Sequence, residues 1–240
     1  GRLGPARGQR WIVADANAYR LAVGIFGVLH TGADAVLPAN LGAGHIARLA
    51  KQAAGIITGE QDLAELAGTL PPHGHGATDA PGLGPLDPAR ARVILHTSGT
   101  TGAPVAVEKP LRCLEAEITA QTQREPLTAG STVVATVPPY HIYGLLFRVL
   151  WPLATGRPFA AATIAYPEQL MAAAVRWPGC TLISSPAFLK RAVEALDMDR
   201  LHQDLGPVFS SGGPLPPSVG ATYNARLTTP IAEVYGSTAT

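Results

Sequence analysis

The feature that most constrains the fold is an alternation between short apolar runs and longer runs with apolar residues at helical spacing. Helical crossovers connect parallel strands, so this alternation predicts an α/β fold with mainly parallel sheets and helices on both faces. The pattern predicts helices over 17–29, 45–54, 110–123, 143–154, 167–176, 186–196 and 216–224. It predicts strands over 33–37, 55–58, 92–97, 105–108, 132–137, 157–161, 181–184, 207–210 and 231–235.

One stretch interrupts the alternation. Residues 68–88, GTLPPHGHGATDAPGLGPLDP, are crowded with Gly and Pro and show no periodicity, which is typical of a long connection. We therefore expect a first α/β unit at 1–75, a connection at 76–90 and a second α/β unit at 91–240.

Composition excludes several classes of partner. Hydrophobic residues make up 47% of the 240 residues, which is enough for a packed core. The chain has 18 Lys and Arg against 17 Asp and Glu and no basic block, so we expect no nucleic-acid partner. No apolar run reaches the roughly 18 residues of a membrane span, so no span is expected. Cys113 and Cys180 are isolated and show no zinc-binding spacing, which favours a cytoplasmic protein.

The stretch VILHTSGTTGAP places small residues directly after a predicted strand. Its glycines let the backbone approach a ligand closely, and its Ser and Thr residues offer hydroxyl groups beside backbone N–H groups, so such a turn can wrap phosphate oxygens. It is not a Walker loop, because GxxxxGK[ST] does not occur here. A solvated turn is the alternative reading, and this stretch alone does not decide between them.

Three later stretches repeat the plan of a strand followed by small or polar residues. VPPYHIYG places His141 where a ligand crevice is expected, although a lone His is more often structural. In VFSSGGPLPP, Gly212 and Gly213 leave room for a flat ring, or they merely form a tight turn. IAEVYGSTAT offers Tyr235 for stacking on a base, or as a core aromatic, and Thr238 for a phosphate or its metal.

A rival motif comes earlier in the chain. GAGHIA at 42–47 fits GxGxxA before a predicted helix, with Glu60 and Asp62 roughly 20 residues further on, as a dinucleotide site requires. Pro38 and Asn40 separate these glycines from the preceding strand, so the alternative reading is an ordinary helix start.

Together the four strand-end stretches carry a resemblance that none carries alone. Their order, SGTTGAP, PPYHIYG, SSGGPLP and EVYGST, resembles the adenylate-forming superfamily of acyl-CoA synthetases, aryl-CoA ligases and adenylation domains of nonribosomal peptide synthetases. The opening stretch RWIVADANAYRL is also similar to that family. The resemblance implies an amino-terminal AMP-binding domain over 1–240, built from two flavodoxin-like, doubly wound subdomains, in which GAGHIA is a helix start.

The resemblance also implies parts that would follow Thr240, namely the family's β-barrel and its small carboxyl-terminal domain. The chain has no initiator Met and its last residues form no terminal element, which agrees with a piece of a longer protein. We therefore expect this piece to be inactive alone.

What the resemblance implies is an ATP- and Mg²⁺-dependent carboxylic acid:thiol ligase. A carboxylate attacks the α-phosphate of ATP to give an acyl-adenylate and pyrophosphate, and the thiol of CoA or a carrier protein then takes the acyl group. His141 would lie beside the acid or the adenylate, and Thr238 would contact the α-phosphate. The implied phosphate-binding residues are Thr97, Ser98, Gly99, Thr100, Thr101 and Gly102. The implied adenine-binding residues are Gly212, Gly213, Pro214, Tyr235 and Gly236.

Two departures from the family pattern affect this expectation. The family has Lys after the proline of the first motif, whereas Val105 follows Pro104 here; Lys109, on the same face of the predicted strand, is either a partial substitute or a solvated strand end. After YGST the family places a Glu that holds Mg²⁺, and this chain has Ala239, so we assign no metal ligand. The alternative function is therefore a catalytically degenerate nucleotide- or acyl-binding module.

Overall fold

The computed structural model describes residues 6–64, 83–97, 105–125, 127–227, 230–236 and 238. They form two compact units, each described by itself below. Unit 1 comprises the residues up to Glu117 together with Tyr140–Ile142, and unit 2 comprises Ile118–Pro139 and the residues from Tyr143 to Thr238. The division between the units falls inside helix α4, Leu111–Arg124.

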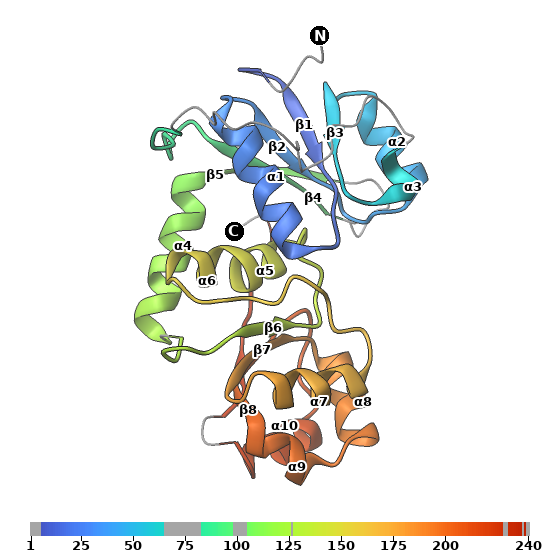
Figure 1. The fold of residues 1–240 in the computed structure, drawn as a ribbon, viewed down its shortest axis with the longest axis vertical. Coiled ribbons are helices and arrows are strands. Elements are labelled where there is room, and N and C mark those ends of the chain that lie inside the picture. The colour runs from blue at the N-terminus through green and yellow to red at the C-terminus, as the bar shows by residue number, and fades with distance from the viewer. Residues whose placement is uncertain are drawn as a thin grey trace. The chain divides into compact units, whose positions relative to one another are not determined.

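Unit 1 contains a five-stranded sheet in the order β3-β1-β2-β4-β5 (Figure 1). The pairs among the first four strands are parallel, and β5 is antiparallel to β4 at the edge. Because β2 and β3 lie on opposite sides of β1, the strand order reverses at β1, as in a doubly wound sheet. The elements are β1 Arg10–Val13, α1 Ala18–His30, β2 Asp34–Leu37, α2 Ala43–Ala50, β3 Gly55–Ile57, α3 Gln61–Ala64, β4 Arg92–Thr97 and β5 Val105–Pro110.

Successive residues of a strand point to opposite faces of the sheet, so apolar side chains lie on both faces. Helices cover both of them. On one face α1 approaches β1 so closely that a Cβ added at Gly24 would lie 2.7 Å from Val13 Cγ1. The Asn17 side chain caps α1 by accepting from the backbone N–H groups of Tyr19 and Arg20. On the other face a core cluster joins the strands to α2 and α3, and its larger members are Ile12, Ile46, Ile56, Leu63 and Ile94.

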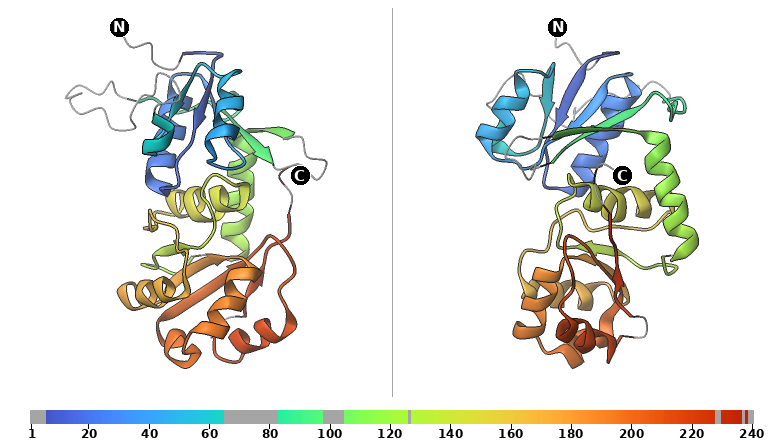
Figure 2. Two further views of the ribbon diagram at one scale, coloured as in Figure 1. Left: turned by 90° about the vertical axis from the view of Figure 1, so that its right-hand side faces the viewer. Right: turned by 180° about the vertical axis from the view of Figure 1, so that it is seen from behind.

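Unit 2 contains a four-stranded parallel sheet in the order β6-β7-β8-β9 (Figure 2). Among the described strands its order follows the chain, so it has no reversal of the kind seen at β1. The elements are β6 Val133–Ala135, α5 Ile142–Gly144, the π-helical segment η1 Leu145–Leu150, α6 Trp151–Ala154, α7 Pro167–Arg176, β7 Cys180–Ser184, α8 Pro186–Ala195, α9 Met198–Asp204, β8 Leu205–Ser210, α10 Pro217–Asn224 and β9 Ala232–Glu233.

Strand alternation again divides the core of unit 2 between two faces. On one face Phe209 packs against Phe147 and Trp151, with ring centroids 5.9 and 5.4 Å away, so the helical segment 142–154 covers that side. The neighbouring residue Val208 belongs to the cluster formed with α7, α8, α9 and α10 on the opposite side. Burial in this second cluster raises the pKa of the Cys180 thiol to about 11.

The middle turns of the segment 142–154 are π-helical rather than α-helical. The Trp151 N–H bonds the carbonyl of Leu146, five residues back. Pro152 follows at once, and a proline inside a helix lacks an N–H and clashes with the carbonyl four residues back, here that of Arg148. The wider π turn relieves that clash, so the sequence supplies a physical reason for the irregularity.

The α/β fold class with mainly parallel sheets, expected from the alternation of segments, is confirmed. The sequence prediction did not list β1 or the short helices α3 and α9. The predicted strand 157–161 is present only as an isolated bridge between Phe159 and Val133. The expected division at 76–90 differs from the structure, because β4 and β5 complete the sheet of unit 1.

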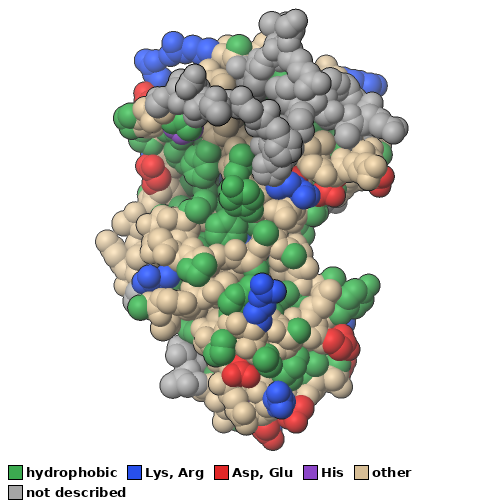
Figure 3. All heavy atoms as spheres, in the orientation of Figure 1, with side chains coloured by type: hydrophobic (Ala, Val, Ile, Leu, Met, Phe, Trp, Pro, Cys, Tyr) green, Lys and Arg blue, Asp and Glu red, His purple; other side chains and the backbone are tan. Residues whose placement is uncertain are grey.

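Charge on the visible surface of unit 2 is mixed. Over α7 to α10, basic, acidic and apolar side chains are interspersed on the face shown in Figure 3. Within the described ranges, no helix is both long and apolar enough to cross a membrane.

Two glycines of α1 test the packing on β1. Gly27 is exposed with nothing within 4 Å of an added Cβ, whereas Gly24 is buried against Val13. We predict that Gly27→Ala raises the free energy of unfolding by about 0.5 to 1 kcal/mol through helix propensity. Gly24→Ala should instead lower it by about 1 to 3 kcal/mol, because the added methyl group overpacks the contact. Urea denaturation of both variants measures this, and equal gains would contradict the packing described.

Candidate functional site

Two sequence-predicted site residues of unit 1, Thr97 and His141, lie near the carboxyl ends of β4 and β2. Leu37 of β2 is the register partner of Leu95 of β4, and Ala39 and Thr97 each follow two residues further along the chain. Thr97 ends β4, and its hydroxyl donates to the Val105 carbonyl at 3.4 Å, across the base of the loop that joins β4 to β5. Ligands of parallel α/β sheets bind outside this edge, and Thr97 ends β4 at that edge.

His141 lies at the same edge of unit 1. Its Nε2 is 2.8 Å from the carbonyl oxygen of Ala39, so Nε2 carries the proton and donates. The ring is exposed and packs edge-on against Tyr140, with ring centroids 4.8 Å apart. Unit 1 therefore places His141 and Thr97 on the carboxyl ends of neighbouring strands.

A second histidine holds the other side of Ala39. The buried His45 accepts the Ala39 N–H at its Nε2, at 3.3 Å. Burial, and secondly the charge of Arg48, lower the pKa of His45, which keeps the ring neutral and able to accept. The pKa of His96, one residue before Thr97, is also lowered by burial.

A network of charges closes the carboxyl end of β1. The buried Asp15 carboxylate accepts from Arg20 Nε at 2.7 Å and from Nη2 at 2.9 Å, and also from the Gly59 backbone N–H at 2.9 Å. Glu60 accepts from the Ala16 backbone at 3.0 Å and lies 3.3 Å from Arg20 Nη2. These hydrogen bonds raise the pKa of Arg20. Glu60 is therefore engaged structurally, which agrees with reading GAGHIA as the start of α2 rather than part of a dinucleotide site.

In unit 2 the predicted adenine-binding residues lie on two neighbouring strand ends. Ser210 of β8 pairs with Glu233 of β9, and the Val234 N–H donates to the Ser210 carbonyl at 2.8 Å. The Ser211 hydroxyl donates to the Val234 carbonyl at 2.7 Å, and the Leu215 N–H donates to Glu233 Oε2 at 3.1 Å. The turn Gly212–Pro214 and the residues Tyr235 and Gly236 are thereby held side by side.

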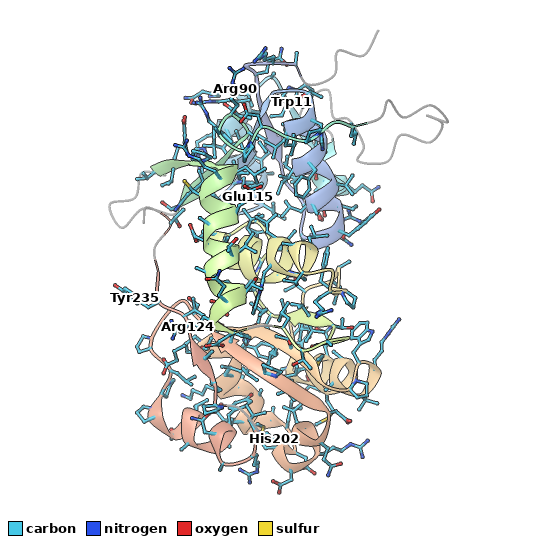
Figure 4. The ribbon with its side chains drawn as sticks, turned by 90° about the vertical axis from the view of Figure 1, so that its left-hand side faces the viewer. Trp11, Arg90, Glu115, Arg124, His202 and Tyr235 are labelled. Atoms are coloured by element: carbon cyan, nitrogen blue, oxygen red, sulfur yellow. The ribbon has the colours of Figure 1, made fainter. Side chains whose placement is uncertain are left out.

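Both turns are open. A Cβ added at Gly212 or Gly213 would meet nothing within 4 Å, and Gly212 has φ +93°, a conformation that favours glycine. Tyr235 is fully exposed and projects from the surface beside β9 (Figure 4). The alternative reading of Tyr235 as a core aromatic is therefore wrong for this structure.

The remaining predicted residues are placed only in part. Thr238 is half-buried in a turn of unit 2. The phosphate-loop residues Ser98, Gly99, Thr100, Thr101 and Gly102 lie outside the described residues, and so does Ala239.

The structure corrects the expectation for Lys109. Lys109 pairs in register with Val93, near the amino end of β4, whereas the phosphate loop leaves the other end at Thr97. Its side chain is only 9% exposed, and Nζ lies 3.4 Å from Glu117 Oε1. Neither reading from the sequence holds, because Lys109 is a buried, paired residue at the far end of the hairpin.

No metal centre emerges from the described part of the chain, where no three His, Cys, Asp or Glu side chains cluster to hold an ion. Residue 239, where the resemblance described above implies a magnesium-binding Glu, is Ala. Neither the described residues nor Ala239 supply a carboxylate set that fits Mg²⁺, and we derive no step through one.

Cavities on the described surface include one in each unit. One, of about 1020 Å³, lies at the amino end of the sheet of unit 1 and is lined by residues that include Arg7, Arg90 and Arg92. The other, of about 730 Å³, lies in unit 2 and is lined by residues that include Phe209, Arg124 and Tyr235. Only the second cavity touches a predicted site residue.

Comparison with known proteins decides the family, because the sequence matches the AMP-binding enzyme family over residues 2–240. The chain belongs to this family. It is 29% identical over 152 residues to a 4-coumarate–CoA ligase of Rhodobacter capsulatus, a match that covers 62% of this chain and 38% of that relative. It is 30% identical over 166 residues to a sulfoacetate–CoA ligase of Cupriavidus necator, covering 66% of this chain and 31% of that relative.

A solved structure of an ATP-bound MatB from Rhodopseudomonas palustris matches with a TM-score of 0.78 at 21% identity. The match covers 98% of this AMP-binding chain and 51% of that structure. The fold expected from the resemblance is therefore confirmed. The chain spans about a third of the length of the two curated relatives and about half of the solved structure.

Sequence reasoning missed one residue of this AMP-binding chain that lies next to a predicted motif. Arg148 is fully buried, and its guanidinium bonds the backbone just before PPYHIYG. The signal that could have found it is a single charge inside the apolar run LLFRVLWPL, since a buried charge needs specific partners.

The hydrogen bond between His45 and Ala39 predicts a dependence of stability on pH. Folding lowers the pKa of His45 below its unfolded value of about 6.5. Between these two pKa values the unfolded chain binds a proton at His45 and the folded chain does not. The free energy of unfolding therefore falls as pH drops through this window. His45→Gln, which keeps an acceptor but does not titrate, should reduce the slope. Because the pKa of His96 shifts in the same direction, His45→Gln/His96→Gln should reduce it further. Urea titrations from pH 5 to 8 measure this, and an unchanged slope in His45→Gln would contradict it.

Proposed function

We propose that the protein activates a carboxylic acid with ATP and transfers the acyl group to a thiol. The observation that carries this proposal is the placement of the predicted residues at carboxyl ends of neighbouring parallel strands, within a chain of the AMP-binding enzyme family. The CoA ligases among its relatives favour CoA as the thiol, and a carrier-protein thiol is the alternative acceptor.

In the first step a carboxylate oxygen attacks the α-phosphorus of ATP, the bond to the β-phosphate bridging oxygen breaks, and pyrophosphate leaves. The loop from Thr97 to Gly102 supplies hydroxyl and backbone N–H donors for the β- and γ-phosphates. Thr238 contacts the α-phosphate. In the second step the thiol sulfur attacks the acyl carbon, its proton is lost, and AMP leaves.

The turns of unit 2 hold the adenine in this proposal. Gly212 and Gly213 present backbone without side chains, and Pro214 completes the edge of the slot. Tyr235, exposed beside Gly236, offers a ring face for stacking. The hydrogen bonds between the two strand ends fix the distance between these parts before ATP arrives, which lowers the entropic cost of binding.

In this proposal His141 lies beside the carboxylic acid or its adenylate. Because its Nε2–H is held by the Ala39 carbonyl, the ring is fixed and only Nδ1 remains to accept a hydrogen bond. We propose that this orientation positions the acid or the adenylate rather than moving a proton from Nε2.

A second candidate function follows from the two departures in sequence. Val105 replaces a phosphate-binding Lys and Ala239 replaces the metal-binding Glu, so a module that binds nucleotide without turnover is the alternative. The alternative predicts ATP binding without adenylate formation.

Pyrophosphate exchange on the natural full-length protein tests the function. With a panel of aryl, fatty and short polar acids, the ligase reading predicts acid-dependent incorporation of labelled pyrophosphate into ATP for at least one class. Measurable ATP binding without exchange for any acid would support the binding module and overturn the ligase.

Removing loop hydroxyls tests the phosphate site. Thr100→Val and Thr101→Val should each weaken ATP binding by about tenfold, because a hydrogen bond to a charged phosphate is worth about 1.5 to 3 kcal/mol. Affinity for the acid should change less than twofold. Thr222→Val, on helix α10 and outside the linings of both cavities, is the matched control, with unchanged ATP affinity. Calorimetric titration measures both ligands, and equal losses for ATP and acid would mean that the loop is only structural.

A further inference from the structure

Arg148 is the residue whose environment the proposed function leaves unexplained. It belongs to the π-helical segment η1 and has no exposed surface. Its Nη1 donates to the Val137 carbonyl and to the Thr163 hydroxyl, both at 2.7 Å, and its Nη2 donates to the Ala161 carbonyl at 2.9 Å. All three acceptors are neutral.

The guanidinium carries a charge that nothing in the described residues neutralises. No carboxylate there lies within ion-pair distance of Arg148, and its Nε–H has no acceptor. Burial lowers its pKa to about 10, so it stays protonated at neutral pH. Burying an unpaired charge costs several kcal/mol, and an apolar side chain of similar volume is often as stable or more so. Stability alone therefore gives no reason for an arginine at this position.

The three hydrogen bonds begin where the backbone ladder of β6 stops. Two backbone hydrogen bonds tie β6 to the segment 160–164, since the Ala160 N–H bonds the Val133 carbonyl and the Ile164 N–H bonds the Ala135 carbonyl, both at 2.8 Å. Val137 lies two residues beyond Ala135, and its carbonyl bonds Arg148 instead of a strand. Arg148 thus fixes the chain at the point where it leaves the sheet.

That point is the start of the turn 138–143, which carries His141. A Cβ at Gly144 would lie 1.9 Å from the Pro138 carbonyl oxygen, so the helix begins in direct contact with the first residue of the turn. One end of the turn is therefore fixed by Arg148 and Gly144, both in unit 2. His141, which the turn carries, bonds the Ala39 carbonyl, and both residues belong to unit 1.

We propose that Arg148 is a positioning residue for His141, holding the base of the turn 138–143 through the Val137 carbonyl. The inference rests on the proposed function, in which His141 contacts the acid or its adenylate. Misplacement of a reacting group by about 1 Å can cost about 100-fold in rate, so a guanidinium with three fixed donors suits this task better than an apolar side chain.

The test compares Arg148→Met, which removes the charge and the donors, with Arg148→Lys, which keeps the charge but not the planar fork. Thr122→Val is the matched control, because the Thr122 hydroxyl accepts from Trp151 Nε1 at 3.0 Å and touches the same helix away from the turn. All variants are made in the natural full-length protein and compared at equal fraction folded. Thr163→Val removes one acceptor only, and serves if Arg148→Met does not fold.

The first measurement needs no activity. We expect hydrogen–deuterium exchange of peptides covering 137–144 to be at least tenfold faster in Arg148→Met than in wild type, intermediate in Arg148→Lys or Thr163→Val, and unchanged in Thr122→Val. The proposal is overturned if the peptides exchange at wild-type rates in both Arg148→Met and Arg148→Lys. If Arg148→Met does not fold, exchange at the wild-type rate in Thr163→Val overturns it.

The second measurement is a double-mutant cycle on adenylate formation. Arg148→Met should lower kcat by about 10- to 100-fold with KM for ATP changed less than threefold, and should cost less than twofold further in a His141→Ala background. An equal loss in both backgrounds would overturn the proposal. If wild type forms no adenylate with any acid, the proposed function fails, while the exchange measurement still decides whether Arg148 holds the turn.

Discussion

Covering both faces of a parallel sheet is the constraint on which the rest of the structure depends. Helices α1, α2 and α3 bury the two faces of the sheet in unit 1, and the segment 142–154 and α7–α10 do the same in unit 2. With both faces buried, only the strand ends can meet a ligand. The residues that follow β8 and β9 lie at such strand ends, which is why we propose them as ligand-binding positions.

Fold class followed from the sequence because helical and strand periods differ strongly in long segments. The prediction failed where the signal is short or atypical. The sequence did not predict β1, because RWIV begins with Arg and is only four residues long, although it lies inside its sheet between β3 and β2. The strand predicted at 157–161 is reduced to an isolated bridge between Phe159 and Val133. Long-range pairing, not local preference, placed β4 and β5 in unit 1.

The order of the motifs predicted the candidate site residues, and the structure shows which hydrogen bonds hold the described ones. Tyr235 is exposed rather than buried, and Lys109 is paired with Glu117 at the wrong end of its hairpin to serve a phosphate. Neither the exposure of Tyr235 nor the pairing of Lys109 can be predicted from sequence spacing, since both depend on which strand lies next to the residue. Arg148 shows the converse: its single charge in an apolar run is visible in the sequence, but only the carbonyl of Val137 beside it suggests a role.

The central claim is that ligand binding is confined to the carboxyl ends of the strands, and hydrogen–deuterium exchange with and without ATP tests it most directly. In the natural full-length protein, ATP should slow exchange in peptides covering 97–105, 210–216 and 233–238. It should leave unchanged the segment 83–92, which lines the cavity at the opposite end of the sheet in unit 1. Protection of 83–92 without protection of the strand-end turns would contradict the account.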